Sequence, residues 1–204
     1  MTYLVVIGFC WALISVLNIL FNPAFAWYVY PLSCLAFIAA AVALDGIVAW
    51  LIRSMPEKQF DYRKKIFRPG PRKKAFLKAI RVRDWKDRVP ELGMFTNFSK
   101  KRLAHPNSPD YLARYILEAC YGIVIHYASV PASLLIPLFD VGMYSGHSNL
   151  WLTVAVPVAA VNAFLIVLPS FILESNLPHL VRLYEYRESK RARAFADACE
   201  SPDR

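Results

Sequence analysis

The chain has 204 residues, of which 57% are apolar, yet it carries a formal net charge of +9. Its mean hydropathy is +0.35. These values exclude one mixed globular domain and agree with apolar membrane spans separated by charged segments.

All 24 Lys and Arg residues fall into two blocks, 53–114 and 182–204. A charged side chain in the hydrocarbon costs roughly 2.5–3.5 kcal/mol on insertion scales, so lipid can surround the stretches that lack Lys and Arg. We therefore predict an all-α membrane protein. It has about four transmembrane helices and a basic interfacial helical segment between spans 2 and 3.

The first predicted domain, residues 1–52, is a transmembrane hairpin. Its apolar runs, Tyr3 to Phe21 and Trp27 to Ile52, are each close to the 20 or so residues that a spanning helix needs. Proline 23 separates them, because the residue before a proline is pushed out of the helical region. Ala24-Phe25-Ala26 also resembles a signal-peptide cleavage site, but the basic n-region is missing and the apolar run is long.

The second predicted domain, residues 53–111, is a cytoplasmic basic segment that lies on the membrane surface. Between Arg53 and Arg114 there are eighteen Lys and Arg residues against six Asp and Glu, interleaved with aromatic residues. This pattern is typical of a surface that contacts anionic lipid, and topogenic charge alone is an alternative explanation. No nucleic-acid-binding module is present. Residues 73–85 are predicted to form one helix in the headgroup plane.

The third predicted domain, residues 112–174, is a second transmembrane hairpin with spans over 112–139 and 150–173, divided by a polar stretch with two glycines. The fourth, residues 175–204, is an amphipathic cytoplasmic tail that returns along the inner surface. Because Lys and Arg stay inside, both termini are predicted to be cytoplasmic in a multi-pass membrane protein.

Polar residues inside the spans are expected to join the helices. Asp45 is expected to face the bundle and pair with a hydroxyl or a cation, and Asn18 and Asn162 are candidate hydrogen-bonding residues between helices. The four cysteines suggest neither a disulfide framework nor a zinc site.

Four segments of the chain form recognisable motifs. They are Arg83-Asp-Trp-Lys-Asp-Arg-Val-Pro-Glu-Leu-Gly93, Phe98-Ser-Lys-Lys-Arg-Leu103, Pro56-Glu-Lys58, and Glu118 followed eight residues later by His126. Together they resemble one bacterial family, the glycosyl-4,4'-diaponeurosporenoate acyltransferases. Asn176-Leu-Pro-His-Leu180 is similar to the family's closing Asn-Arg-Pro-Arg-Leu. Three positions depart from the family: Ile123 replaces a second glutamate, and Leu177 and His179 replace arginines.

The resemblance implies a bacterial cell membrane enzyme without a cofactor or metal. It would transfer a fatty acyl group from an acyl thioester donor to a sugar hydroxyl of a carotenoid glycoside or related glycolipid. A noncatalytic scaffold or lipid-binding protein derived from the family is the alternative, and Leu177 and His179 favour it. A transporter is disfavoured, because no inverted repeat is visible.

Glu118 and His126 are the candidate catalytic residues, since they are the only acid and the only imidazole in the third predicted span. Eight helical positions separate their directions by about 80° and their heights by about 12 Å, so they cannot touch. His126 would act as general base, and Glu118 would orient a substrate hydroxyl or a basic residue. Hydrogen bonding between helices is the alternative role for both. If the span starts at Leu112, His126 lies about 21 Å along it, near mid-bilayer.

The candidate substrate-binding residues follow from the same motifs. Trp85, Lys86 and Arg88 would bind the donor, with the cations on its phosphate. Lys101, Arg102 and Asn176 complete this set, and anchoring to anionic headgroups is the alternative for the cations. His105 and Asp110 also fit a His-x₄-Asp acyltransferase spacing, but Asp110 is better explained as the cap of the following helix.

Overall fold

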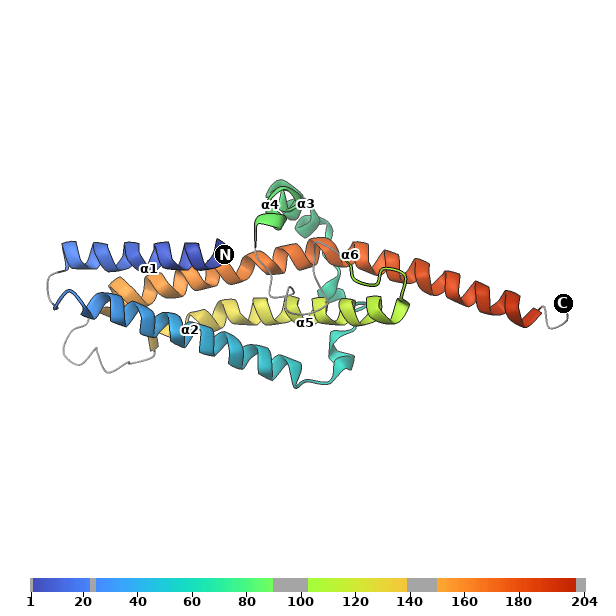
Figure 1. Cartoon of the computed structure of the whole chain (residues 1–204), viewed down its shortest axis with the longest axis horizontal. Coiled ribbons are helices and arrows are strands. Elements are labelled where there is room, and N and C mark those ends of the chain that lie inside the picture. Colours follow the sequence, from blue (N-terminus) through green and yellow to red (C-terminus); the bar gives the residue numbers. More distant parts are fainter. Residues whose placement is uncertain (1, 23–24, 90–102, 139–149, 201–204) are drawn as a thin grey trace. The chain divides into compact units, whose positions relative to one another are not determined.

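Figure 1 shows a computed structural model of the chain, which describes residues 2–22, 25–89, 103–138 and 150–200. The described residues are helical and contain no strand, which confirms the predicted all-α class. The chain divides into two compact units, which are treated separately below. The first unit comprises Met1–Met55, Arg88–Pro90 and Val124–Ser170, and the second comprises Pro56–Asp87, Glu91–Ile123 and Phe171–Arg204.

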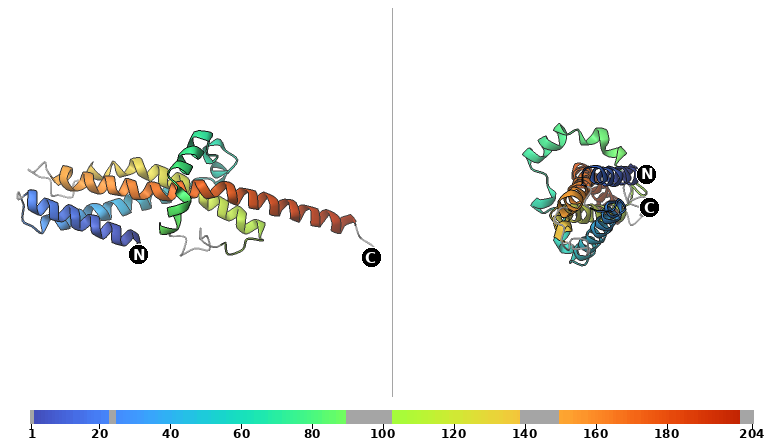
Figure 2. Two further views of the ribbon diagram at one scale, coloured as in Figure 1. Left: turned by 90° about the horizontal axis from the view of Figure 1, so that it is seen from above. Right: turned by 90° about the vertical axis from the view of Figure 1, so that its left-hand side faces the viewer.

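The first unit begins with α1 (Thr2–Phe21) and α2 (Val29–Arg53), which coincide with the two apolar runs of the predicted hairpin. They pack against each other, as Figure 2 shows. The indole Nε1 of Trp11 donates to the backbone oxygen of Pro31 at 3.0 Å and so fixes one helix against the other. Most other outward side chains of α1 are large and exposed, as expected of a lipid-facing helix.

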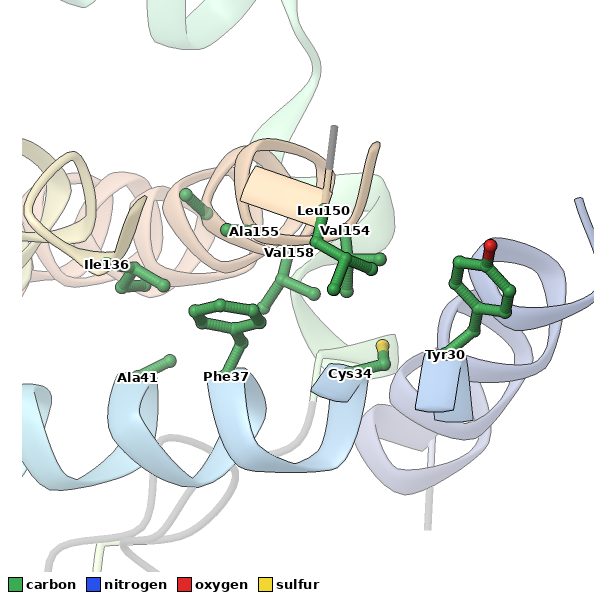
Figure 3. Packing of buried hydrophobic residues seen from close by; sticks show 10 residues of the cluster. Tyr30, Cys34, Phe37, Ala41, Ile136, Leu150, Val154, Ala155 and Val158 are labelled. Carbon is green, nitrogen blue, oxygen red and sulfur yellow. The ribbon is translucent and has the colours of Figure 1, made fainter. Parts of the chain in front are cut away.

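The core of the first unit forms where α2 meets the start of the last helix (Figure 3). A π-helical turn, η6 (Trp151–Ala155), leads into α6 (Val156–Glu200), and the short η5 (Ile136–Leu138) packs beside it. On α2, the fully buried Phe37 lies between two small buried residues, Cys34 and Ala41. The buried residues are Tyr30, Cys34, Phe37, Ala41, Ile136, Leu150, Val154, Ala155, Val158 and Ala159.

A proline explains a polar contact between α1 and η6. Pro157 has no backbone N–H, so it cannot donate to the carbonyl of Thr153 four residues earlier, as another residue of an α-helix would. The side-chain nitrogen of Asn18 donates to that carbonyl at 3.0 Å. The prediction that Asn18 hydrogen-bonds between helices is confirmed.

The second unit contains the basic segment, which folds as η1 (Glu57–Phe60), η2 (Lys65–Phe67), α3 (Pro71–Ala79) and α4 (Val82–Trp85). The single helix predicted over 73–85 is wrong, because α3 ends at Ala79 and Arg81 takes a left-handed conformation with φ of 52°. Figure 2 shows α3 and α4 as separate short helices. The indole Nε1 of Trp85 donates to the carbonyl of Ile80 at 2.8 Å, which satisfies one group that the break leaves open.

Helix α5 (Pro109–Ser133) begins with Pro109, and Ser108 is its cap, because the Ser108 hydroxyl accepts the backbone N–H of Tyr111 at 3.3 Å. The predicted capping role of Asp110 is therefore wrong. The helix contains Pro131 and ends at Ser133, six residues before the predicted end of span 3 at 139.

Helix α6 runs without interruption for 45 residues. The boundary expected between residues 174 and 175 is thus not a helix boundary, and the predicted tail is a continuation of α6.

Three helices are long and apolar enough to cross a membrane: Leu4–Phe21, Val29–Arg53 and Trp151–Phe195. They indicate membrane association. Helix α5 is not among them, since Glu118, His126 and its serines interrupt its apolar residues. Four spans therefore remain a prediction.

Candidate functional site

A group of charged and polar side chains joins the basic segment to α6 in the second unit. We call it the α3–α4–α6 cluster, and it comprises Lys73, Arg83, Lys86, Glu174, Asn176 and His179. Its three cations come from α3, α4 and η3 (Lys86–Arg88), and its three partners lie within six residues of α6. The cluster therefore connects segments that are about 90 residues apart in sequence.

The contacts of the cluster pair each cation with one group of α6. The Nζ of Lys86 donates to the side-chain oxygen of Asn176 at 3.5 Å. The guanidinium of Arg83 lies 3.2 Å from Nε2 of His179, so a neutral imidazole can accept its N–H. Lys73 and Glu174 form an ion pair.

The backbone break at Arg81 places these cations. Leu77 of α3 and Val82 of α4 are both buried, and between them the chain turns through the left-handed residue. The left-handed backbone conformation is unfavourable for most residues other than glycine. Its cost is offset here by the bond from Trp85 to Ile80 and by the hydrogen bond from the backbone N–H of Asp84 to the carbonyl of Arg81. The turn therefore directs Arg83 and Lys86 toward α6.

Glu174 is the residue of this cluster that the sequence analysis missed. Its side chain is only 3% exposed, and a carboxylate so deeply buried needs a cation or hydrogen bonds. The signal was present in the sequence, because Glu174 is the first acidic residue after the apolar run that begins at Leu150. Its partner, Lys73, lies 101 residues away and could not be identified from spacing.

The charge of the cluster affects His179, which lies beyond the apolar run 150–173 of α6. Partial loss of solvent lowers the pKa of its imidazole below the usual 6.5, and the positive charges of Arg83, Arg182 and Lys86 lower it further. His179 is therefore uncharged at neutral pH.

A second polar group of the same unit surrounds Arg114 on α5. Its guanidinium donates to Glu118 at 3.0 Å and to Glu57 at 3.2 Å. Glu118 thus holds a basic residue, which is one of the two roles expected for it. Nearby, the ring of Phe60 packs against Tyr121 with centroids 4.4 Å apart. Glu57 and Phe60 both belong to η1, so these contacts attach the start of the basic segment to α5.

His126 belongs to the first unit, whereas Glu118 belongs to the second. His126 is half-buried on α5, and no hydrogen bond or ion pair of its imidazole is found among the described residues. Arg88 falls in the first unit and is exposed. Lys101 and Arg102 lie outside the described residues.

The His105–Asp110 spacing does not form a dyad in the described structure. The ring of His105 packs against Tyr111, with centroids 5.5 Å apart. The carboxylate of Asp110 instead lies 3.6 Å from the guanidinium of Arg191.

The family comparison covers the segments that these contacts join. A family model described as "Glycosyl-4,4'-diaponeurosporenoate acyltransferase" matches residues 56–186, which include the basic segment, α5 and the first part of α6. No curated protein and no solved structure matches the chain. Within the matched range, Lys86 meets Asn176 and Arg83 meets His179, so two motifs that the resemblance named separately are neighbours in the fold.

Proposed function

We propose that this chain, which belongs to the glycosyl-4,4'-diaponeurosporenoate acyltransferase family, esterifies a sugar hydroxyl of a glycosylated carotenoid or related glycolipid with a fatty acyl group. The donor is a fatty acyl thioester, and no cofactor is needed. The enzyme acts in the bacterial cell membrane, with both termini in the cytoplasm and anionic lipid against its basic segment. Its three apolar helices support this location.

One observation carries the proposal: the contact between the motif around Trp85 and the motif around Asn176. Cations held beside an amide are suited to bind a phosphate group, because ionised donors make the strongest hydrogen bonds. Such a phosphate is present in thioester carriers of fatty acids. Lys86 and Arg83 would bind it, Asn176 would orient it, and Trp85 would fix the turn that carries Lys86.

The reaction needs one base and two oriented substrates. In our proposal, His126 accepts the proton of the acceptor hydroxyl while the hydroxyl oxygen attacks the thioester carbonyl. The new C–O bond forms, the C–S bond breaks, and the leaving thiolate takes the proton back from the imidazole. Glu118 does not take part in this proton transfer directly; it positions the side chain of Arg114.

The proposal is tested by lipid and pigment mass spectrometry of a deletion strain complemented with variants. We expect the acylated glycoside to disappear in the deletion strain and its deacylated form to accumulate. His126→Ala should not restore it. Lys86→Ala should raise the donor KM by about tenfold, consistent with a lost charged hydrogen bond. Lys74→Ala is the matched control, since Lys74 is an exposed lysine of α3 outside the cluster. An unchanged lipid profile in the deletion strain would refute the proposal.

A noncatalytic scaffold derived from the family is the second candidate. It is favoured by Leu177, which is 2% exposed and serves packing where the family has an arginine. The lipid composition of a strain that produces His126→Ala at a normal level distinguishes the two candidates. If the chain is a scaffold, this composition matches that given by the unaltered chain; if it is the enzyme, the acylated glycoside is missing.

A further inference from the structure

Four polar side chains meet inside the first unit, away from the α3–α4–α6 cluster. They are Asp45 of α2, Ser129 and Ser133 of α5, and Asn162 of α6. The side-chain nitrogen of Asn162 donates to Ser133 at 3.0 Å and to Asp45 at 3.4 Å. The Ser133 hydroxyl in turn donates to the carbonyl of Ser129 at 2.9 Å. Three helices are thus joined by one amide.

Two atoms of this group have hydrogen-bonding capacity left over. The Ser129 hydroxyl faces the Asp45 carboxylate, yet Oδ1 of Asp45 and Oγ of Ser129 both lack a hydrogen-bond partner of normal geometry among the described residues. Ser129 is only 1% exposed. A buried polar atom without a partner loses its hydrogen bonds to water and is unfavourable. A group that donates to the carboxylate and accepts from the serine would satisfy both, and a hydroxyl does both.

His126 lies on the same face of α5 as the two serines. Ser129 and Ser133 follow it by three and seven residues, which places all three within about 60° around the helix. The polar face therefore runs from the imidazole to Asp45 and Asn162 without leaving the unit.

The same contacts fix the depth of His126. Asn162 bonds Asp45 and Ser133, so these two residues lie at one level. From Asp45, α2 advances about 12 Å to Arg53, and from Ser133, α5 goes back about 10 Å to His126. The two helices run in opposite directions (Figure 1). His126 therefore lies level with Arg53, at the charged end of α2.

An apolar cavity adjoins the group. It has a volume of about 50 Å³, and Asn162 lines it together with Cys10, Trp11, Cys34 and Ile38 among others. A ligand that places a hydroxyl against Asp45 could thus place carbon atoms next to these side chains. The surroundings suit an amphiphile more than a free sugar.

We propose that Asp45, Ser129 and Asn162 form a hydroxyl-binding subsite that holds the sugar of an amphiphilic glycoside beside His126. One sugar hydroxyl donates to Oδ1 of Asp45 and accepts from Ser129, while Asn162 holds the carboxylate in place. The assignment rests on the proposed function, for which it supplies the acceptor side, but the binding itself involves no covalent step.

The test uses the full chain in nanodiscs, with dodecyl glucoside and its per-O-methylated derivative as probes. The methylated probe keeps the ring and the alkyl chain but cannot donate a hydrogen bond. We expect the unaltered chain to bind the glucoside about tenfold more tightly than the methylated probe. Asp45→Asn and Ser129→Ala should each reduce this preference to about twofold or less.

Ser170→Ala is the matched control, because Ser170 is a fully buried serine of the same unit whose hydroxyl donates to the carbonyl of Val167. It should keep the preference. If Asp45→Asn and Ser129→Ala melt like the unaltered chain and also keep the preference, the subsite is refuted. If the two variants keep the preference but have a lower melting temperature, the polar group only joins the helices, and the subsite is refuted as well. A preference that depends on Asp45 in a protein without acyl transfer would refute the proposed function and retain the subsite.

Discussion

The pairing of Lys73 with Glu174 shows how one cation stabilises a carboxylate that is almost inaccessible to water. Glu174 is 3% exposed and Lys73 is 39% exposed, so the desolvation cost falls on the acid. Replacing Lys73 by methionine keeps an unbranched side chain that is one heavy atom shorter and removes its charge. We expect Lys73→Met to lower the free energy of unfolding by about 1–3 kcal/mol.

Thermal unfolding in detergent micelles measures this effect. The double variant Lys73→Met/Glu174→Gln should recover most of the loss, because the amide no longer needs a cation. Lys74→Met is the control and should be neutral. A double variant less stable than Lys73→Met alone would contradict this account of the pair.

The lowered pKa of His179 predicts a pH dependence of stability. A folded-state pKa below the unfolded value means that the unfolded chain takes up the proton first as the pH falls. The contribution of His179 is therefore complete above about pH 6.5 and is lost as the pH falls toward the lower folded-state pKa. We expect His179→Gln to reduce the fall in melting temperature as the pH drops below about 6.5, and His105→Gln serves as the matched control. An equal slope in both variants would show that another group titrates.

The contacts of single residues could be predicted where one polar residue stands in an otherwise apolar run. Asn18 and Asn162 stood alone in apolar runs, and both bond between helices as expected. Asp45 was expected to pair with a hydroxyl or a cation, and the hydroxyl of Ser129 does face its carboxylate, while the amide of Asn162, which was not expected, also donates to it. The pairing of Lys86 with Asn176 could not be predicted, because no spacing rule relates residues 90 positions apart.

At the level of the elements, Gly122 marks a close approach between α5 and α6. A Cβ added there would lie 2.7 Å from a methyl carbon of Leu173. The sequence analysis of this span identified the two polar residues around it but not its neighbour. A larger side chain must displace Leu173, and such overpacking costs about 1–3 kcal/mol.

We therefore expect Gly122→Leu to lower the thermal stability. The control is Gly46→Leu on α2, where nothing lies within 4 Å of an added Cβ and where leucine has the better helix propensity. Gly46→Leu should be neutral or slightly stabilising. Equal destabilisation by both substitutions would indicate a general effect of added bulk.

Helix boundaries were predicted well where composition changes abruptly and poorly where it does not. Helix α1 ends at Phe21, two residues before Pro23, and α2 ends at Arg53, the first arginine of the chain. The break between α3 and α4 carries no glycine or proline, and Arg81 adopts its left-handed conformation only because buried Leu77 and Val82 fix the chain on either side. Tertiary packing thus overrides local propensity at this turn.

For the whole molecule, the length of α6 determines how much of it lipid can cover. A helix of 45 residues extends about 67 Å, more than twice the roughly 30 Å of a bilayer core. Its apolar part ends near Leu173, and six Lys and Arg residues follow between Arg182 and the C-terminus. The sequence predicted both parts but not their continuity, since no breaking signal is needed where a helix leaves the membrane.

Labelling of single cysteines in a cysteine-free variant tests the topology. A membrane-impermeant maleimide should label Ser189→Cys, on an exposed position of α6, in inside-out vesicles only. Phe164→Cys, which is 63% exposed in the absence of lipid, should resist the reagent in both orientations. Labelling of Ser189→Cys in intact cells would contradict a cytoplasmic C-terminus.

The bond from Asn18 to Thr153 has a consequence for biosynthesis. The two residues are 135 positions apart, so α1 leaves the ribosome long before its acceptor is translated. During this interval the amide is not wholly unpaired, because the same nitrogen donates to the carbonyl of Ile14 in its own helix at 2.8 Å. The nascent helix can therefore enter the lipid with a local partner for this amide, and the amide gains Thr153 as a second acceptor once the final helix is inserted.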